Sequence, residues 1–515
     1  MSVARADVQK NAGSSVSNGK DAQPTTTPIK HVVVIFDENV SFDHYFGTYP
    51  YATNPPGEPK FTPAPNTPKD INNYITHPSL PTNNPNHNTD GTVANPQRLD
   101  RSQEVTADMD HGYISEQSAY DNGKMDNFVA ATGHGNPLVM DYYDGNTVTG
   151  LWNYAQHYAM NDNSFDTVMG PTLPGHLNLI SGSTQGVKVY SSNSTTGTAV
   201  QLKPGDTGYP SGTVVNGTMV SNMNPYFDKA STGQTAELTG KNIGDLLNVK
   251  GVTWGWFIGG FRNTSETHKN YAGQSVLDYA WPFTDPFQFY KSTANPNHLP
   301  PSSPQMIGHT DEANHQYDLT DFWTAVDSNN LPSVSYLKPP AGWSGHPGAS
   351  SPLDEQQWIV NTINGLEASP EWKSTAVIIN YDDSDGWYDH VMPPTVHTSD
   401  GTNRTAYGPR LPLLVISPYA KQNFVDHTLT AQTSILKFIE DNWNLGRIGG
   451  NSMDAIAGSL NNMFNFSREP SDKRLFLNPM TGEPEAPNAA HVQFESWLQS
   501  LYSDAGVPMP NRSED

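Results

Sequence analysis

Two clusters of carboxylate and amide side chains each follow a short apolar run that is typical of a buried strand. Oxygen ligands of this kind suit a hard divalent cation, and neighbouring carboxylates repel each other unless a cation neutralises them. The carboxyl ends of parallel strands meet at one edge of a sheet, so both clusters would lie together there. The alternative is ordinary turn aspartates and helix caps, but two clusters, each ending a buried strand, favour a metal site. They are Asp37-Glu38-Asn39 after His31–Phe36, and Asp382-Asp383-Ser384-Asp385 after Thr375–Tyr381.

The segment Gly170-Pro171-Thr172 offers a candidate nucleophile. Apolar residues after it, such as Leu177 and Ile180, predict a helix with Thr172 at or just before its N-terminus. Backbone N–H groups and the helix dipole favour phosphate at such a position. A hydroxyl there could attack phosphorus if a metal lowered its proton affinity. The simpler alternative, which the local pattern alone favours, is that Thr172 only caps the helix.

Four histidines lie in contexts that favour a functional role. The chain has 17 histidines, so most must be structural or surface residues. His111 follows an Asp-Met-Asp run, His315 follows an asparagine, His346 lies in a glycine- and proline-rich loop, and His390 closes the second acidic run. Histidines in loops rank above the others because loops carry much of a protein's binding and catalysis.

The elements that must position these residues can be read from hydrophobic patterns. Four near-continuous apolar runs, rich in β-branched and aromatic residues, predict strands that are covered on both faces. Helical patterns lie between them, among them Thr430–Trp443, for which Thr430 is the candidate cap. This alternation predicts an α/β fold with a mostly parallel sheet. The strands are His31–Phe36, Val252–Ile258, Thr375–Tyr381 and Leu411–Ser417, and the other helices are Thr147–Tyr158, Asp354–Leu366 and Val492–Leu501.

Residues 30–515 are predicted to form a single domain with long insertions. Polar stretches rich in proline or glycine lie near residues 50–104, 187–240 and 283–310. We expect them to be surface excursions, although some could fold over the site as a rim or lid. Residues 1–29 are polar and lack the apolar segment of a signal peptide, which predicts a disordered tail or the start of a mature exported chain.

The composition excludes several classes of function. The 515 residues include 28 Lys and Arg against 52 Asp and Glu, a formal net charge of -24, so nucleic-acid binding is not expected. The absence of cysteine excludes disulfide scaffolds, cysteine nucleophiles, zinc ribbons and iron–sulfur clusters. No stretch approaches the ~20 apolar residues of a membrane span, so stable membrane insertion is not expected. The cysteine-free, loop-rich composition favours a secreted or periplasmic protein.

Six motifs follow one another along most of the chain. They are Glu38–Gly47, Gly170–Leu177, Ser344–Pro347, Tyr381–Val391, Tyr407–Pro418 and Asp426–Leu436. Together they resemble the bacterial phosphoesterase family, which contains acid phosphatase A-type enzymes and bacterial phospholipases C. The resemblance implies a three-layer α/β/α sandwich like that of alkaline phosphatase, with a mostly parallel central sheet and long loop insertions.

The same resemblance implies one divalent metal ion, of which Ca²⁺, Mg²⁺ and Mn²⁺ all suit an oxygen-rich site. Glu38, Asn39, Asp382 and Asp383 would hold the metal, and Thr172 would complete its coordination. Thr172 would also attack phosphorus and form a covalent phospho-threonine intermediate.

The family resemblance also assigns roles to histidines. His111, His315 and His346 would contact the transferring phosphate or assist proton transfer, with His346 favoured as the group that protonates the leaving oxygen. His390 would support the site. One departure concerns His315, because some relatives carry two histidines at that point.

Three functions are compatible with these residues. An acid phosphatase that hydrolyses small phosphomonoesters is favoured, and histidines protonated at low pH would assist it. The alternative is a phospholipase C that hydrolyses phosphatidylcholine-like diesters, for which a threonine at position 172 is the more usual residue. A catalytically inactive binding protein would require a missing ligand or nucleophile, and none is missing. Four tryptophans could form a cage for a choline head group, or be core or rim residues: Trp254, Trp256, Trp343 and Trp387.

Overall fold

The protein is built on a sheet of eight strands in which one strand runs against the others. The computed structural model describes residues 23–195, 198–395 and 407–510. The strand order is β15 (Gln316–Asp318), β12 (Trp254–Ile258), β16 (Val334–Lys338), β1 (His31–Asp37), β17 (Thr375–Tyr381), β18 (Leu413–Ile416), β4 (Ala159–Asn161) and β19 (Phe424–Asp426). The first five are mutually parallel, β18 is antiparallel to both of its neighbours, and β19 is parallel to β4.

The four predicted strands are all present, with small differences at their ends. β1 and β17 lie side by side at the centre of the sheet, paired from His31 and Thr375 to Asp37 and Tyr381. The fourth predicted strand, β18, runs antiparallel to β17. Parallel neighbours need a crossover connection, which a helix usually supplies. The described residues between β17 and β18 contain no helix, which is consistent with the antiparallel pairing of these two strands.

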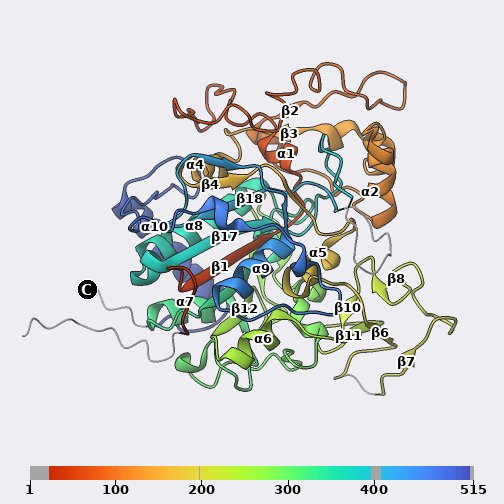
Figure 1. Ribbon diagram of the computed structural model, residues 1–515, viewed down its shortest axis with the longest axis vertical. Helices are drawn as coiled ribbons and strands as arrows, with labels where there is room; N and C mark the ends of the chain where they lie inside the picture. Colours follow the sequence, from red (N-terminus) through yellow and green to blue (C-terminus); the bar gives the residue numbers. More distant parts are fainter. Residues whose placement is uncertain (1–22, 196–197, 396–406, 511–515) are drawn as a thin grey trace, which may run out of the picture.

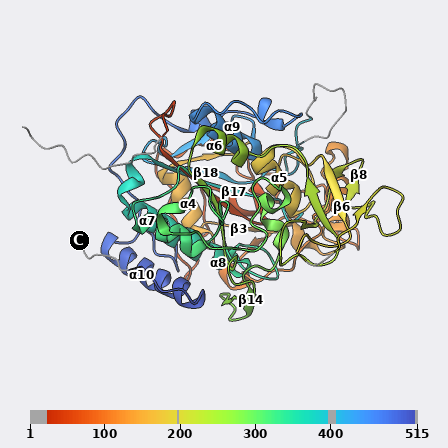
Figure 2. The ribbon, with the colours of Figure 1, turned by 90° about the horizontal axis from the view of Figure 1, so that it is seen from below.

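Helices cover both faces of the sheet, which confirms the predicted α/β/α sandwich (Figures 1 and 2). One face is covered by α5 (Thr172–Ser181), α6 (Ile243–Lys250) and α9 (Gln432–Asn442). The other is covered by α4 (Thr149–His157), α7 (Leu319–Asp327), α8 (Pro352–Ala368) and α10 (Pro487–Asp504). Three short helices lie outside these layers: α1 (Phe42–Phe46), α2 (Tyr113–Tyr120) and α3 (Phe128–Ala131).

One predicted helix cap is wrong. Thr430 belongs to a short strand, β20 (Thr430–Ala431), which pairs with β5 (Ser164–Phe165), and α9 therefore begins only at Gln432. By contrast, α8 has reciprocal capping hydrogen bonds between Ser351 and Asp354. A serine or threonine before an apolar run caps a helix only where its backbone does not pair with a neighbouring strand.

The predicted insertions differ in structure. Residues 50–104 form loops at the top of Figure 1, where β2 (Arg98–Leu99) pairs with β3 (Tyr142–Tyr143). Residues 187–240 build a small sheet at the lower right. Its strands are β10 (Asn224–Pro225), β11 (Thr235–Leu238), β6 (Val187–Tyr190) and β7 (Gln201–Leu202), with the hairpin β8 (Val214–Val215) and β9 (Thr218–Met219) nearby.

The third insertion is not a surface excursion throughout. Phe287 and Phe289 lie in a 3₁₀ turn and are fully buried, and the ring centroid of Phe287 lies 4.7 Å from that of Trp254. Apolar burial of this kind makes the start of residues 283–310 part of the core. The sequence predicted a surface excursion because the prolines of this stretch outweighed its aromatic residues.

Only the end of the predicted N-terminal tail can be compared with the prediction. Of residues 1–29, residues 1–22 lie outside the described part of the chain. Thr27 donates from its hydroxyl to Oδ1 of Asn442 over 2.7 Å, and Ile29 is fully buried. The last residues of the predicted tail are therefore packed against the end of α9.

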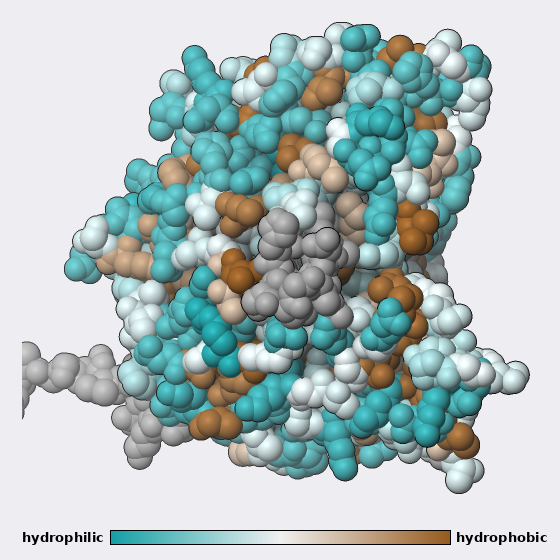
Figure 3. Space-filling view, turned by 45° about the vertical axis from the view of Figure 1, so that its right-hand side comes forward, coloured by the Kyte–Doolittle hydropathy of each residue, from teal (hydrophilic) through white to brown (hydrophobic). Residues whose placement is uncertain are grey.

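The side of the molecule shown in Figure 3 is largely hydrophilic, and its hydrophobic side chains form small separate groups. None of the helices in the described ranges combines the length and the apolar character needed to cross a lipid bilayer.

Candidate active site

The two acidic clusters come together at the carboxyl edge of the sheet, because they follow the adjacent parallel strands β1 and β17. The Asn39 backbone N–H donates to Oδ1 of Asp382 over 3.1 Å. The Asn39 side-chain amide donates to Oδ1 of Asp385 over 2.8 Å. The backbone N–H of Val40 donates to the carbonyl of Asp383. The structure thus joins the two predicted clusters into one group.

This group contains buried oxygen atoms that have no hydrogen-bond partner among the described residues. They are Oε2 of Glu38, Oδ1 of Asn39, Oδ2 of Asp382 and Oδ2 of Asp383. Leaving such atoms buried and unpaired is costly, and a divalent cation among them would supply the missing partner. The four residues therefore offer oxygen ligands of the kind that the predicted metal needs.

A buried lysine, which the sequence prediction missed, also belongs to this group. Lys338 ends β16, beside β1, and its Nζ forms an ion pair with Oε1 of Glu38. Burial alone would raise the pKa of Glu38, but the charges of Lys338 and His346 lower it below its ordinary value. Burial and the charge of Glu355 raise the pKa of Asp37 well above its ordinary value. Of the neighbouring residues Asp37 and Glu38, Glu38 is therefore the one whose charged form is favoured.

Thr172 is the first residue of α5, and its side chain does not cap the helix. The N-cap residue is Pro171, which makes no side-chain capping bond. Within the described part of the chain, the Thr172 hydroxyl makes no hydrogen bond. The simple capping alternative therefore does not hold.

Close packing holds α5 against the loop that carries the second acidic cluster. Nδ1 of His176 lies 3.6 Å from Oδ2 of Asp382 and 3.0 Å from the carbonyl of Thr172. A Cβ atom at Gly175 would lie only 2.1 Å from the backbone oxygen of Asp382. The glycine thus permits the approach that sets the first turn of α5 beside the loop that carries Asp382 and Asp383.

Glu116, at the buried side of α2, ties the nucleophile segment to the same loop. Its carboxylate accepts from the Gly170 N–H over 2.8 Å and from the Ser384 hydroxyl over 2.9 Å. Burial and the charge of Asp383 raise the pKa of Glu116 to about 8. No sequence motif singled out this residue, because its role depends on a contact between segments that are far apart in the chain.

The small sheet formed by residues 187–240 also reaches this region. The backbone N–H of Leu173, in the first turn of α5, donates to Oδ1 of Asn222 over 2.9 Å. This contact favours the interpretation of that insertion as a rim of the site.

Two of the three predicted phosphate-site histidines converge on the acidic group. Nδ1 of His111 lies 3.2 Å from Oδ1 of Asp385, and Nε2 of His111 lies 4.0 Å from Oδ2 of Asp383. Nε2 of His346 lies 3.9 Å from Oε2 of Glu38. The two rings are 6.5 Å apart, and each side chain is 12% exposed. A small group that enters from solvent could contact both.

His315 lies away from these residues, contrary to the prediction that it contacts phosphate. It precedes β15, so it lies at the amino edge of the sheet, where its Nδ1 is 3.0 Å from the carbonyl of Trp254. Its ring stacks on that of Trp254 at 4.4 Å, and burial lowers its pKa to about 4. A loop context cannot show whether a histidine precedes a strand or follows one.

His390 lies in an ion-pair network that contains Asp43, Asp389 and Arg410. Its Nδ1 pairs with Asp43, which also pairs with Arg410 over 2.9 Å. Arg410 reaches Asp389 over 3.0 Å as well. Asp43, Asp389 and His390 could geometrically hold a metal, but Arg410 already pairs with both carboxylates. The group instead ties the loop after β1 to the loop after β17.

The tryptophans divide between core and rim. Three are fully buried core residues, namely Trp254, Trp256 and Trp387. Trp343 is only partly buried and packs on His268. The tryptophan beside the site is Trp281, which sequence analysis missed; it is partly exposed and stacks on His346 with ring centroids 4.5 Å apart.

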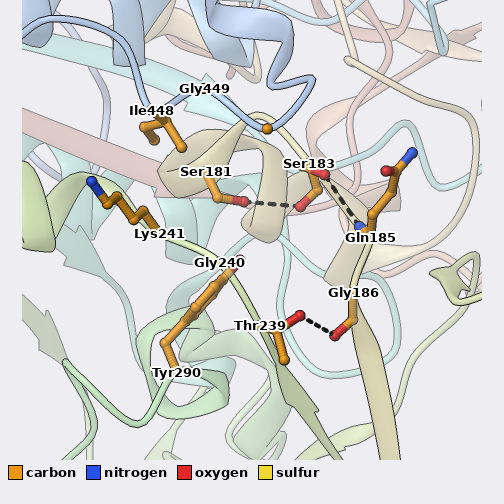
Figure 4. Close-up of a pocket in the computed structure, with 11 residues that line it drawn as sticks. Ser181, Ser183, Gln185, Gly186, Thr239, Gly240, Lys241, Tyr290, Ile448 and Gly449 are labelled. Atoms are coloured by element: carbon orange, nitrogen blue, oxygen red, sulfur yellow. Dashed lines mark hydrogen bonds between the residues drawn. The ribbon is translucent and has the colours of Figure 1, made fainter. Parts of the chain in front are cut away.

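A pocket of ≈ 390 Å³ lies at the opposite end of α5 (Figure 4). It is lined by Ser181, at the end of that helix, together with Lys241 and Tyr290. Ser181 is nine residues after Thr172, or roughly 14 Å along the helix axis. None of the predicted site residues lines this pocket, which is therefore separate from the acidic group.

The fold and the site together define a phosphoesterase. Residues 29–446 match the Phosphoesterase family, and the chain belongs to that family.

Curated relatives include phospholipases C. The chain is 24% identical over 498 residues to the non-hemolytic phospholipase C of Pseudomonas aeruginosa, with 90% of this chain and 61% of the relative covered. It is 26% identical over 514 residues to phospholipase C B of Mycobacterium tuberculosis, with 93% of this chain and 84% of the relative covered. Among solved structures, a protein in the alkaline phosphatase superfamily from Vibrio parahaemolyticus is 11% identical, with 69% of this chain and 81% of that chain covered and a TM-score of 0.29.

Proposed function

We propose that the protein is a metal-dependent phospholipase C that hydrolyses phosphatidylcholine-like diesters. The observation that carries this proposal is the similarity of nearly the whole chain to bacterial phospholipases C. It reverses the order of the two alternatives that the sequence alone supports, in which the acid phosphatase comes first. The substrate is then a phospholipid head group with its lipid, and not a small monoester.

We assign the metal to Glu38, Asn39, Asp382 and Asp383, with Thr172 as the fifth residue, on the strength of the unpartnered oxygens described above. When bound, a divalent cation would neutralise the charge of the substrate phosphate and lower the proton affinity of the Thr172 hydroxyl. The oxygen-rich set is compatible with Ca²⁺, Mg²⁺ or Mn²⁺.

In this proposal Thr172 and His346 carry out the bond changes. Oγ1 of Thr172 loses its proton to solvent and attacks phosphorus, and the bond from phosphorus to the glycerol oxygen breaks. His346 gives a proton to that oxygen, and diacylglycerol leaves. Water then attacks the phosphorus of the phosphocholine–threonine ester and gives a proton to His346. The bond from phosphorus to Oγ1 breaks, Oγ1 takes a proton from solvent, and phosphocholine is released.

His111 has a positioning and charge role in this scheme. Burial opposes its charged form, but Asp383 and Asp385 raise its pKa well above the ordinary value. A cationic His111 beside Asp383 and Asp385 would stabilise the phosphate oxygens during transfer. Trp281 is the side chain that we assign to the choline group, because a partly exposed indole next to His346 can face a quaternary ammonium ion.

The test compares two substrates with one purified protein. Phosphocholine release from phosphatidylcholine in mixed micelles is measured beside phosphate release from an aryl monoester, with and without a chelator, and with Thr172→Ala as the inactive control. We expect chelator-sensitive lipid hydrolysis that exceeds monoester hydrolysis. Chelator-sensitive monoester turnover without lipid cleavage would instead establish the acid phosphatase.

A secreted or periplasmic location is part of this proposal, because it suits a cysteine-free chain with a phospholipid substrate. Fractionation of the producing cell would test it, with the protein expected outside the cytoplasm.

A further inference from the structure

A second group of metal-ligand side chains lies on the hairpin of β13 (Thr267–Lys269) and β14 (Ser275–Leu277). Glu266, His268 and Asp278 each place one ligand atom within 4.8 Å of the others, and all three are buried. None of them belongs to the active site described above. The hairpin and α10 both lie along the lower edge of Figure 2.

Glu266 has a buried carboxylate that lacks a partner in the described part of the chain. It is 6% exposed, and within the described ranges its carboxylate makes no hydrogen bond and no ion pair. Oδ1 of Asp278 is likewise buried without a partner. Burial and the charges of Asp318 and Asp278 raise the pKa of Glu266 to about 8. An unpaired carboxylate buried beside other carboxylates is costly unless a cation or a proton neutralises it.

Both ring nitrogens of His268 face carboxylates. Its Nδ1 pairs with a carboxylate oxygen of Asp278. Nε2 lies 3.2 Å from Oδ2 of Asp504, the last residue of α10. Burial opposes protonation of His268, but Asp278, Asp504 and Glu266 raise its pKa. Three carboxylates therefore surround one imidazole.

We propose that Glu266, His268 and Asp278, together with Asp504, form a second divalent-cation site. An imidazole nitrogen among carboxylate oxygens favours Zn²⁺ or a similar transition metal over Ca²⁺ and Mg²⁺, which take oxygen ligands. No lysine or arginine in the described part of the chain pairs with Glu266 or Asp278. A metal cation would therefore not have to displace such a side chain from these carboxylates.

The role of this site is structural. It joins the hairpin to the end of α10, and it borders the segment that leads to His346. The backbone N–H of Ala341 donates to the carbonyl of Asp278 over 3.1 Å, and the ring of Trp343 lies 4.5 Å from that of His268. A bound cation would hold these three parts of the chain together.

Direct zinc binding tests the proposal without using catalytic activity. The full chain is stripped with a chelator and titrated with Zn²⁺ by calorimetry, and bound zinc is counted by atomic absorption after gel filtration. The variants are Glu266→Gln and His268→Asn, and the matched controls are exposed residues, Glu312→Gln and His491→Asn. We expect both site variants to lose one equivalent of zinc or to bind it at least about tenfold more weakly, and both controls to bind as the wild type does.

The Asp383→Asn variant separates this site from the active site. If the active site also binds Zn²⁺, this variant loses a different equivalent, and Glu266→Gln still loses its own. If the active-site assignment is wrong, Asp383→Asn binds as the wild type does, and the loss in Glu266→Gln is unchanged.

Wild-type zinc binding by Glu266→Gln would overturn the proposal, since it would mean that Glu266 is simply a protonated buried acid. This variant is the decisive one because it breaks no side-chain hydrogen bond found in the structure, so it tests the site even if His268→Asn does not fold.

Discussion

The side-chain amine of Lys338 and the Oε1 atom of Glu38 form an ion pair that is almost completely buried at the end of the central strands. The other oxygen of the same carboxylate, Oε2, has no hydrogen-bond partner in the described part of the protein. One carboxylate thus faces two cations, a fixed ammonium group on one side and the proposed metal on the other.

Replacement of Lys338 by methionine should therefore make stability depend strongly on the metal. Breaking a buried pair from one side costs about 3–5 kcal/mol, because the carboxylate left behind is uncompensated. We expect Lys338→Met to lose about this much in chelator and to recover part of it when Mn²⁺ is added, as measured by denaturant unfolding. Lys188→Met is the control, because Lys188 and Glu237 form a partly exposed pair worth at most about 1 kcal/mol. Equal losses in the free energy of unfolding with and without Mn²⁺ would argue against a metal on Glu38.

Substitutions of Thr172 distinguish a nucleophile from a structural residue. Thr172→Val keeps the shape but removes the hydroxyl, and we expect kcat to fall at least about 10³-fold. Thr172→Ser keeps the hydroxyl and should stay within about tenfold of the wild type. Mass spectrometry of enzyme that is acid-quenched during turnover of phosphatidylcholine should find a phosphocholine adduct on residue 172. A Thr172→Val enzyme with near-normal turnover would exclude the covalent mechanism.

His346 should matter most when the leaving oxygen needs a proton. General acid catalysis contributes about 10²–10⁴-fold, so His346→Asn should lose this much on a lipid or alkyl ester. In kcat/KM, which reports the steps up to release of the leaving group, a p-nitrophenyl ester should lose much less, because its leaving group departs as a stable anion. His315→Asn is the internal control, since that ring lies at the other edge of the sheet. Equal losses of kcat/KM on both esters would show that His346 is not the general acid.

Trp281 should affect choline lipids selectively. We expect Trp281→Ala to raise KM for phosphatidylcholine by about 2- to 30-fold, the range of a cation–π contact, while Trp281→Phe retains most of the affinity. The same variants assayed on an ester without a quaternary ammonium group should change little. Parallel losses on both substrates would mean that Trp281 only packs on His346.

Glu367 provides a pH-dependent contribution to stability that is unrelated to catalysis. It is fully buried on α8, accepts a hydrogen bond from Tyr158, and burial raises its pKa to about 7. Because the folded state binds this proton more tightly than the unfolded state, the stabilisation is complete below pH ~4.5 and is lost as pH rises through about 7. The free energy of unfolding should fall by up to about 3 kcal/mol over this range through Glu367 alone.

Glu367→Gln should remove that contribution. Urea unfolding at about pH 5 and about pH 7 measures the difference in the free energy of unfolding, which should be smaller in Glu367→Gln than in the wild type by about 2 kcal/mol. Glu312→Gln is the control, because Glu312 is exposed. An unchanged pH dependence of stability in Glu367→Gln would show that Glu367 is not its source.

The elements nearest the site could be predicted from the sequence because their signals are local. The apolar runs of β1 and β17 are unbroken, and the acidic residues follow them directly, so the carboxyl-edge rule places Glu38 and Asp382 together. The helix that begins at Thr172 follows from the spacing of its apolar residues.

Other features depend on contacts between distant segments. Lys338 ends a strand that was not predicted, and Glu116 lies on a helix with little apolar periodicity. His315 and His346 both lie next to small or polar residues, yet one precedes β15 and the other follows β16. Only the order and direction of the strands decide which of them reaches the site.

The close approach of Gly175 to Asp382 restricts how the enzyme can evolve. Any side chain at position 175 would have to displace backbone, since its Cβ would lie 2.1 Å from the Asp382 carbonyl oxygen. Such a shift would separate the nucleophile from the metal loop in a single step. In a library that randomises this codon and is selected for activity, we expect glycine alone to survive, whereas position 172 should also accept serine.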